Sequence, residues 1–295
     1  MNTTTLSPVT PAAAAASRTT PPMRAKLSAA GVIRSEWIKL RTVRSTLWCY
    51  GILILLIAGI GVLVASLSDV GAAGLTGDAA GSLVVGLNTV GLNIAVLIVA
   101  VLGSLIITGE YSTGMIRSTF AAVPGRTGAL AAKGFVLAVS TFVATSVGIW
   151  LSVLVSTPIL AGKGVDVDLA DPAVFLPLLG GAVYVAMIAL LAFGFGALLR
   201  NTAGALAMVL GIMLIAPLIL QMLAGLVQAD WVTSISTLLP QSAGGHLFAF
   251  DGGGTVAPTA SGALTLNGWG GFGVLAAWDA LVLASAWILV KRRDA

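Results

Sequence analysis

Few residues in this sequence have the types and the spacing of a catalytic or metal-binding site. Cys49 is the single cysteine and His246 the single histidine, which excludes an internal disulfide and every metal motif built from cysteine pairs. There is neither a His-Glu-x-x-His motif nor a pair of carboxylates within one apolar segment, so hydrolysis inside a membrane would lack its general acid and base. We therefore predict no catalytic residues, no metal and no resident cofactor.

Two glycine patterns have the outline of nucleotide-binding motifs but not their context. Gly162-Lys163 is followed by Gly164 rather than by the Ser or Thr of a phosphate-binding loop. The stretch from Gly268 to Gly273 fits G-x-G-x-x-G, but it opens an apolar segment and follows no βαβ pattern. We predict that the chain itself binds neither ATP nor a dinucleotide.

The composition indicates that the solvent of this chain is a lipid bilayer. Of 295 residues, 58% are hydrophobic and 9% are charged, whereas soluble domains have about 45–50% apolar and about 25% charged residues. Apolar runs reach the ~20 residues needed to cross a membrane and lack the alternation of barrel strands. We predict an all-α integral membrane protein with six transmembrane helices, at about Leu47–Leu67, Leu83–Ile107, Ala131–Leu160, Val174–Leu199, Ala203–Val227 and Gly270–Val290.

The distribution of basic residues predicts the orientation. With six spans and a cytoplasmic N-terminus, fourteen of the fifteen Lys and Arg residues fall on the inner side, and only Lys163 falls outside. The net charge of +4 is therefore explained by topology, and its spread over short segments argues against a nucleic-acid partner. We predict a multi-pass protein of the cell inner (plasma) membrane with both termini in the cytoplasm.

The segments outside the spans divide into a tail, a surface helix and connections. Residues 1–26 are rich in Thr, Ala and Pro without the pattern of a signal peptide, and we expect a disordered tail. Residues 27–46 combine apolar residues at helical spacing with several arginines, which favours an interfacial helix over the alternative of a plain basic flank. Residues 47–295 then form the six-span domain, in which residues 228–268 are expected to fold back into the outer part of the bundle.

The longest cytoplasmic connection, Gly109–Arg126, has the pattern of a short amphipathic helix. Met115, Ile116, Thr119, Phe120 and Val123 would form one apolar stripe, and Pro124-Gly125 would end the helix. Such a helix at the inner surface is suited to docking a cytoplasmic partner, and the alternative is that it only lies on lipid.

Asp279 is the other polar residue of interest. It lies near the middle of the sixth span, where insertion of a carboxylate costs about 2.5–3.5 kcal/mol. We expect it to face the interior of the bundle or a cavity, as part of a substrate pathway or as the donor or acceptor of a structural hydrogen bond.

Four motifs together carry a family resemblance over about Ala30 to Ala295. They are Arg34-Ser-Glu-Trp-Ile-Lys-Leu-Arg41-Thr-Val-Arg44-Ser, Gly109-Glu110-Tyr111 with Gly114-Met115-Ile116-Arg117, Pro124 and Arg126, Leu239-Pro240 with Ala243-Gly244, and the terminal Lys291-Arg-Arg-Asp294. These motifs resemble the type-2 ABC transporter permeases of high-GC Gram-positive bacteria. Met115 stands where many members of that family have Thr.

The resemblance implies a fold, partners and a site. It implies a six-span permease with an interfacial connecting helix before the first span, and a coupling helix between the second and third spans that seats in a separate ATPase subunit, which binds ATP and Mg. Two permease copies, identical or different, would form an exporter with two ATPases. The residues carried over to the coupling surface are Glu110, Met115, Ile116, Arg117, Phe120 and Arg126. Membership does not name the substrate.

Two readings of a different class stay open beside the export permease. An ion-coupled secondary transporter or channel usually needs charged or broken-helix sites near the membrane midplane, and only Asp279 qualifies here. A membrane assembly factor without transport activity is the other alternative.

Overall fold

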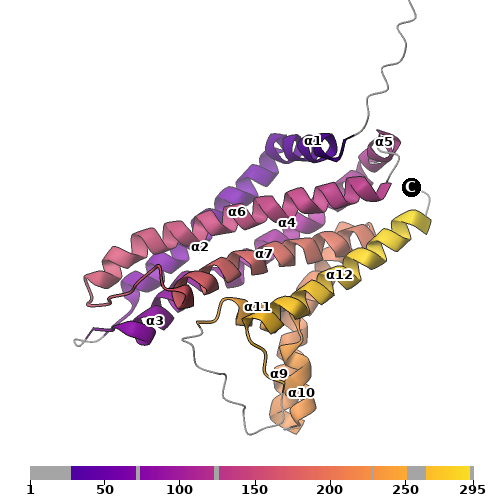
Figure 1. Ribbon diagram of the computed structural model, residues 1–295. Helices are drawn as coiled ribbons and strands as arrows, with labels where there is room; N and C mark the ends of the chain where they lie inside the picture. Colours follow the sequence, from indigo (N-terminus) through magenta and orange to yellow (C-terminus); the bar gives the residue numbers. More distant parts are fainter. Residues whose placement is uncertain (1–27, 71–73, 123–125, 228, 251–263, 293–295) are drawn as a thin grey trace, which may run out of the picture.

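The structure is a computed structural model that describes residues 28–70, 74–122, 126–227, 229–250 and 264–292 (Figure 1). The side chains of residues 117, 120–122 and 126 also lie outside the description. The disordered tail expected for residues 1–26 lies outside the described residues.

Helices make up almost all of the described chain. In order they are α1 (Ala29–Thr42), α2 (Arg44–Leu67), α3 (Gly77–Thr89), α4 (Leu92–Ser112), α5 (Met115–Ala122), α6 (Arg126–Ala161), α7 (Pro172–Leu199), α8 (Thr202–Leu210), the π-helix η1 (Gly211–Ile215), α9 (Ala216–Val227), α10 (Asp230–Thr237), α11 (Pro240–Leu247) and α12 (Gly268–Arg292). An isolated bridge joins Leu75 and Val165.

Within the described residues, six helical segments are long and apolar enough to cross a membrane, which confirms the all-α class and the six predicted spans. They are Arg44–Leu67, Gly77–Ser112, Thr127–Ala161, Pro172–Leu199, Thr202–Val227 and Gly268–Arg292. The second segment combines α3 and α4 and begins six residues before the predicted Leu83. These early turns, residues 77–82, contain small and polar residues that hydropathy does not mark as a span, and packing stabilises them, with Ala80 and Gly81 buried.

The core lies around α7, whose residues are apolar on every face. α7 packs against α4, α6 and α12, while α2 packs against α6 (Figure 1). Glycine allows close approach between α4 and α7, because a Cβ atom at Gly103 of α4 would lie 2.4 Å from the carbonyl oxygen of Ala189 in α7. Close backbone contact is the usual source of helix association in a membrane, where lipid supplies no hydrophobic drive.

The fifth span is distorted where the sequence places Pro217. Proline has no N–H to donate, and the turn that precedes it is the π-helix η1, in which Ala216 N–H bonds to Gly211 O. The distortion that precedes Pro217 thus takes the form of a π-bulge. The segments α10 and α11 follow, and α11 packs against both α12 and α7, with Pro240, Ala243 and Gly244 buried.

α1, α5 and the end of α12 lie at one end of the bundle, which we call the α5 end (Figure 1). α3 and the connection between α6 and α7 lie at the opposite end (Figure 1). Lys163, the basic residue that the predicted topology leaves outside, is in that connection. Its Nζ donates to the carbonyl oxygens of Ala65, Ser66 and Ser68, at 2.9, 2.7 and 2.8 Å. Lys163 therefore caps the C-terminus of α2, where a cation also complements the helix dipole.

Candidate functional site

Four charged side chains from three helices meet at the α5 end, and we call them the charge cluster: Glu36 and Lys39 of α1, Glu110 of α4 and Lys133 of α6. Lys133 Nζ donates to Glu36 Oε2 and, at 2.8 Å, to Glu110 Oε1. Lys39 Nζ donates to Glu36 Oε1 at 2.8 Å and to Glu110 Oε1 at 3.3 Å. Glu36, Glu110 and Lys133 are buried, being 4%, 5% and 6% exposed. The cluster is electrically neutral and ties α1 to both α4 and α6.

Local sequence places these groups. Glu36 and Lys39 are three residues apart and therefore share one face of α1. Glu36 is the buried residue of α1, while Trp37 and Ile38 on either side of this face are 40% and 50% exposed. Glu110 lies in the last turn of α4, two residues before the helix ends at Ser112. α1 is thus held to the bundle by the buried carboxylate of Glu36 as well as by Leu40, which packs against the core.

Ion pairing keeps Glu36 and Lys39 charged. Burial alone would raise the pKa of the Glu36 carboxyl, but Lys133 and then Lys39 outweigh burial and hold that pKa below its ordinary value of 4.5. Burial alone would lower the pKa of the Lys39 ammonium, but the hydrogen bond to Glu36 and the charge of Glu110 raise that pKa above 10.5. Both groups are therefore charged at neutral pH.

α5 follows the charge cluster directly. α4 ends within three residues of α5, and Gly114, with φ of +73°, makes the turn between them in a conformation that favours glycine. Ile116 is buried in the core, at 5% exposed, whereas Met115 is 47% exposed. The short helix expected in the Gly109–Arg126 connection is therefore present as Met115–Ala122, with Ile116 turned toward the bundle and Met115 away from it.

The predicted coupling residues are not all brought together. Glu110 belongs to the charge cluster and not to the exposed surface of α5. Met115 and Ile116 lie on different sides of α5. The side chains of Arg117, Phe120 and Arg126 lie outside the described residues.

A second polar contact joins the α7–α8 junction to the end of α4. Arg200, in the left-handed conformation with φ of 52°, places its guanidinium 5.0 Å from the centre of the Tyr111 ring. Thr202 Oγ1 donates to Thr108 Oγ1 at 2.8 Å. The fourth and fifth spans are thereby fixed to the residues that lead into α5.

Asp279 lies far from this end, within α12. It is 7% exposed and shares the buried face of α12 with Leu275, Val282 and Ala286. Its Oδ2 has no hydrogen-bond partner among the described residues. The carboxylate does face the interior, as the sequence predicts, but the alternative of a structural hydrogen bond has no support at this oxygen.

The charge cluster was not predicted from the sequence. Lys39 and Lys133 counted only among the basic residues that predict the orientation of the spans, and Glu36 was only one residue of the motif that begins at Arg34. The sequence did contain a signal for the cluster, because Glu36 and Glu110 are its only two glutamates. Glu36 lies before the first span and Glu110 after the second, each beside basic residues that are predicted to be cytoplasmic. Their meeting on Lys133 depends on tertiary packing, which no local pattern specifies.

A comparison with protein families matches residues 32–217 to the ABC-2 family transporter proteins. The match covers more than half of the chain, from α1 through the π-bulge of the fifth span. The chain belongs to the ABC-2 transporter family. This confirms the family that the motifs of α1 and of the α4–α5 connection resemble. A comparison with curated proteins finds no match.

Membership agrees with the six spans and makes the chain a multi-pass membrane component of an ABC transporter. The charge cluster, α5 and the Tyr111–Arg200 contact all lie within the matched residues, whereas Asp279 lies beyond them. The family match therefore bears on the α5 end and says nothing about α12.

Proposed function

We propose that this ABC-2 family chain is the membrane-spanning permease subunit of an ATP-driven exporter. In this proposal it lies in the plasma membrane with both termini in the cytoplasm and forms the substrate pathway together with a second permease copy. A separate cytoplasmic ATPase subunit binds ATP and Mg²⁺ and drives the transport cycle. Family membership supports this, because membrane proteins of the ABC-2 family generally work with ATP-binding subunits.

The observation that carries the proposal is the position of α5. This short helix lies outside the six spans, at the same end as α1 (Figure 1). The apolar side chain of Met115 is exposed. The helices before and after it, α4 and α6, are bridged by Glu110 and Lys133. A displacement of α5 by a partner would therefore move the ends of α4, α6 and α1 together.

The predicted coupling residues receive separate roles in this proposal. Met115, with Arg117, Phe120 and Arg126, contacts the ATPase. Ile116 anchors α5 to the bundle through its burial in the core. Glu110 transmits the displacement to α1 and α6 through the charge cluster.

The test is co-purification with the ATPase encoded beside the gene, together with substrate-stimulated ATP hydrolysis on the same preparations. Met115→Asp and Phe120→Asp would force a charge into an apolar contact, and we expect each to weaken ATPase binding by about 2 kcal/mol or more. Met115→Leu and Phe120→Leu are the matched controls, because they keep the apolar surface. Glu110→Ala is expected to reduce stimulated hydrolysis more than co-purification.

Normal co-purification and normal stimulated hydrolysis in both aspartate variants would overturn the coupling role of α5. If α5 only lies on lipid, both aspartate variants should keep normal co-purification and hydrolysis, because α5 would not contact the ATPase. Membrane insertion is checked in each variant, so that a loss of binding is not a loss of the protein.

Orientation has its own test. After replacement of Cys49, an impermeant thiol reagent added to intact cells is expected to label a cysteine at position 168 but not one at position 117. The opposite pattern would reverse the proposed topology. In this topology Lys163 is the one basic residue on the outer side. Its ammonium group donates hydrogen bonds there to the carbonyl oxygens at the end of α2.

Asp279 favours a second candidate, an ion-coupled secondary transporter, because a buried carboxylate with an unpartnered oxygen is a usual element of ion and proton sites in membranes. In the exporter, the same carboxylate would belong to the substrate pathway. Transport that stops without ATP but persists without a proton gradient supports the exporter, and the reverse supports the secondary transporter.

A further inference from the structure

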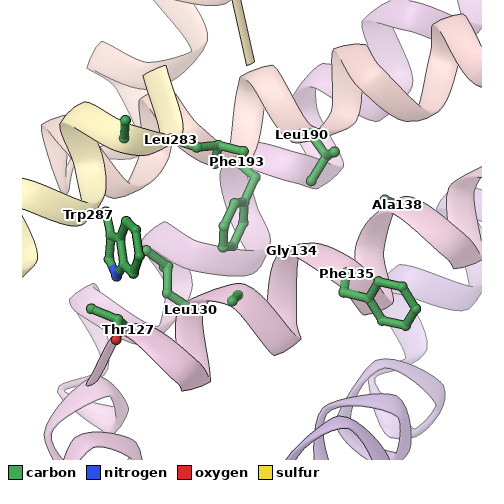
Figure 2. A pocket seen from close by; sticks show the side chains of 11 residues that line it. Thr127, Leu130, Gly134, Phe135, Ala138, Leu190, Phe193, Leu283 and Trp287 are labelled. Atoms are coloured by element: carbon green, nitrogen blue, oxygen red, sulfur yellow. The ribbon is translucent and has the colours of Figure 1, made fainter. Parts of the chain in front are cut away.

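A groove of about 450 Å³ opens between α6, α7 and α12, within the spans. Its lining is almost entirely apolar and includes Thr127, Leu130, Gly134, Phe193, Leu283 and Trp287 (Figure 2). The groove exists because α6 presents small residues here: a Cβ atom at Gly134 would lie 3.5 Å from both Leu190 and Phe193 and would meet no closer atom. Its volume falls in the range of about 300–1,000 Å³ found for ligand sites.

The two ends of the groove differ in polarity. Figure 2 shows Thr127 and Trp287 together at one end, and Phe135 at the other. Trp287 is half exposed, and Lys291 Nζ lies 4.8 Å from the centre of its ring. Lys291 and Arg292 are exposed in the last turn of α12, so a basic surface stands directly beyond the tryptophan end.

An apolar slot with an amphipathic aromatic residue and cations at one end matches the layout of a phospholipid. The acyl chain is apolar along its length, and the phosphate lies at the level where tryptophan and basic residues gather in membrane proteins. Basic sites between transmembrane helices attract anionic rather than zwitterionic headgroups.

We propose that this groove binds one acyl chain of an anionic phospholipid from the surrounding bilayer, with its phosphate next to Lys291 and Arg292. This lipid site is separate from the coupling surface at α5 and from Asp279, and it does not depend on the proposed transport activity. The lipid is a resident of the bundle that fills the gap between α6 and α12.

The experiment is native mass spectrometry of the full-length chain, purified in mild detergent, with added phosphatidylglycerol or phosphatidylcholine of identical acyl chains. We expect the wild-type chain to retain phosphatidylglycerol over phosphatidylcholine by about fivefold for each engaged basic residue. Lys291→Gln should remove about fivefold of this preference, while Arg41→Gln, which changes an exposed cation of α1, should leave it unchanged.

Gly134→Leu fills the groove and should reduce retention of both lipids. Gly128→Leu is the matched control, because it makes the same change in α6 where a Cβ atom meets nothing within 4 Å. If Gly134→Leu fails to fold, Lys291→Gln, which changes an exposed side chain, still tests the preference for phosphatidylglycerol over phosphatidylcholine.

Equal retention of the two lipids by the wild-type chain would overturn the proposal, as would equal effects of Gly134→Leu and Gly128→Leu. The same spectra report the number of protein copies. A change in copy number on Gly134→Leu with lipid retention intact would show that a second chain, and not a lipid, covers the groove.

Discussion

Glu110 and Asp279 are buried to a similar extent, at 5% and 7% exposed, but their surroundings differ. Each carboxylate has one buried oxygen, Glu110 Oε2 and Asp279 Oδ2, without a hydrogen-bond partner among the described residues. Glu110 differs in that its Oε1 accepts hydrogen bonds from two lysines of the charge cluster. A buried charge is tolerated where it is paired, and an unpaired polar group is a cost that packing must offset. Glu110 therefore holds helices together. Stability alone does not explain why Asp279 is buried.

The largest effect is expected from removing Lys133. Lys133→Met would leave Glu36 and Glu110 buried with only the partly exposed Lys39 between them. Breaking a buried ion network on one side costs about 3–5 kcal/mol, and we expect a corresponding loss of thermal stability in detergent. Lys39→Met is the control, with a smaller loss expected because the Lys39 side chain is 38% exposed.

The double variant Glu110→Met/Lys133→Met sharpens this prediction. It removes one charge of each sign and leaves Glu36 with Lys39, 2.8 Å away. We expect it to recover most of the stability lost in Lys133→Met, because apolar replacement of a buried pair is often close to neutral. A double variant as unstable as the single one would show that Lys133 acts by packing and not by charge.

Asp279 should show the opposite relation between stability and function. Asp279→Leu removes an unpartnered buried oxygen, which elsewhere costs about 1–3 kcal/mol, so the free energy of unfolding should stay unchanged or rise. Transport should fall if the carboxylate belongs to the substrate pathway, and Asp279→Asn should retain expression and much of the transport. Thermal unfolding and transport are measured on the same preparations. Unchanged transport in Asp279→Leu would remove Asp279 from the pathway.

The spans and the charge cluster were predictable from the sequence to different degrees. The six spans follow from hydropathy alone, because no other structure satisfies the backbone of such long apolar runs. The early turns of the second span, residues 77–82, were missed because small and polar residues lower their hydropathy, although Ala80 and Gly81 are buried by packing. Further along the same helix, buried Asn88 accepts hydrogen bonds from Ser152 at 2.5 Å and Ser156 at 3.1 Å, which lie in α6, 64 and 68 residues away. The pairing of Glu36 with Lys133 likewise spans 97 residues, and no local pattern specifies contacts of that separation.

α5 is an intermediate case. The apolar stripe correctly predicted a helix in the connection, since helical spacing is a local property. Which side of the helix faces the bundle was not readable, and the structure places Ile116 inward and Met115 outward. Orientation depends on the turn at Gly114 and on packing against the core.

A smaller effect is expected at Lys163, a lysine bonded to backbone oxygens instead of carboxylates. Lys163→Met would leave the carbonyl groups of Ala65, Ser66 and Ser68 to water at the end of α2. Because this region is partly exposed, we expect a loss of about 1 kcal/mol, well below that of Lys133→Met. Hydrogen exchange should increase in the last turn of α2 and not at the α5 end. Exchange that increases equally at both ends would contradict a local cap.

The smallest effect is expected from pH, since the stability contributed by Glu36 and Lys39 should not change between about pH 5 and pH 9. The pKa of Glu36 is lowered, so the stability it contributes is present above its unfolded value near 4.5 and is lost as pH falls through the lower folded value. The pKa of Lys39 is raised, so its contribution is fully present below 10.5 and is lost as pH rises through the higher folded value. Both contributions are therefore constant in the interval between them. The measurement is the difference in thermal stability between wild type and Glu36→Gln, which should be flat from pH 5 to pH 9 and should shrink below about pH 4.5. A difference that changes within the flat interval would mean that Glu36 is not held ionised by Lys133 and Lys39, and the contrast with Asp279 would then lose its electrostatic basis.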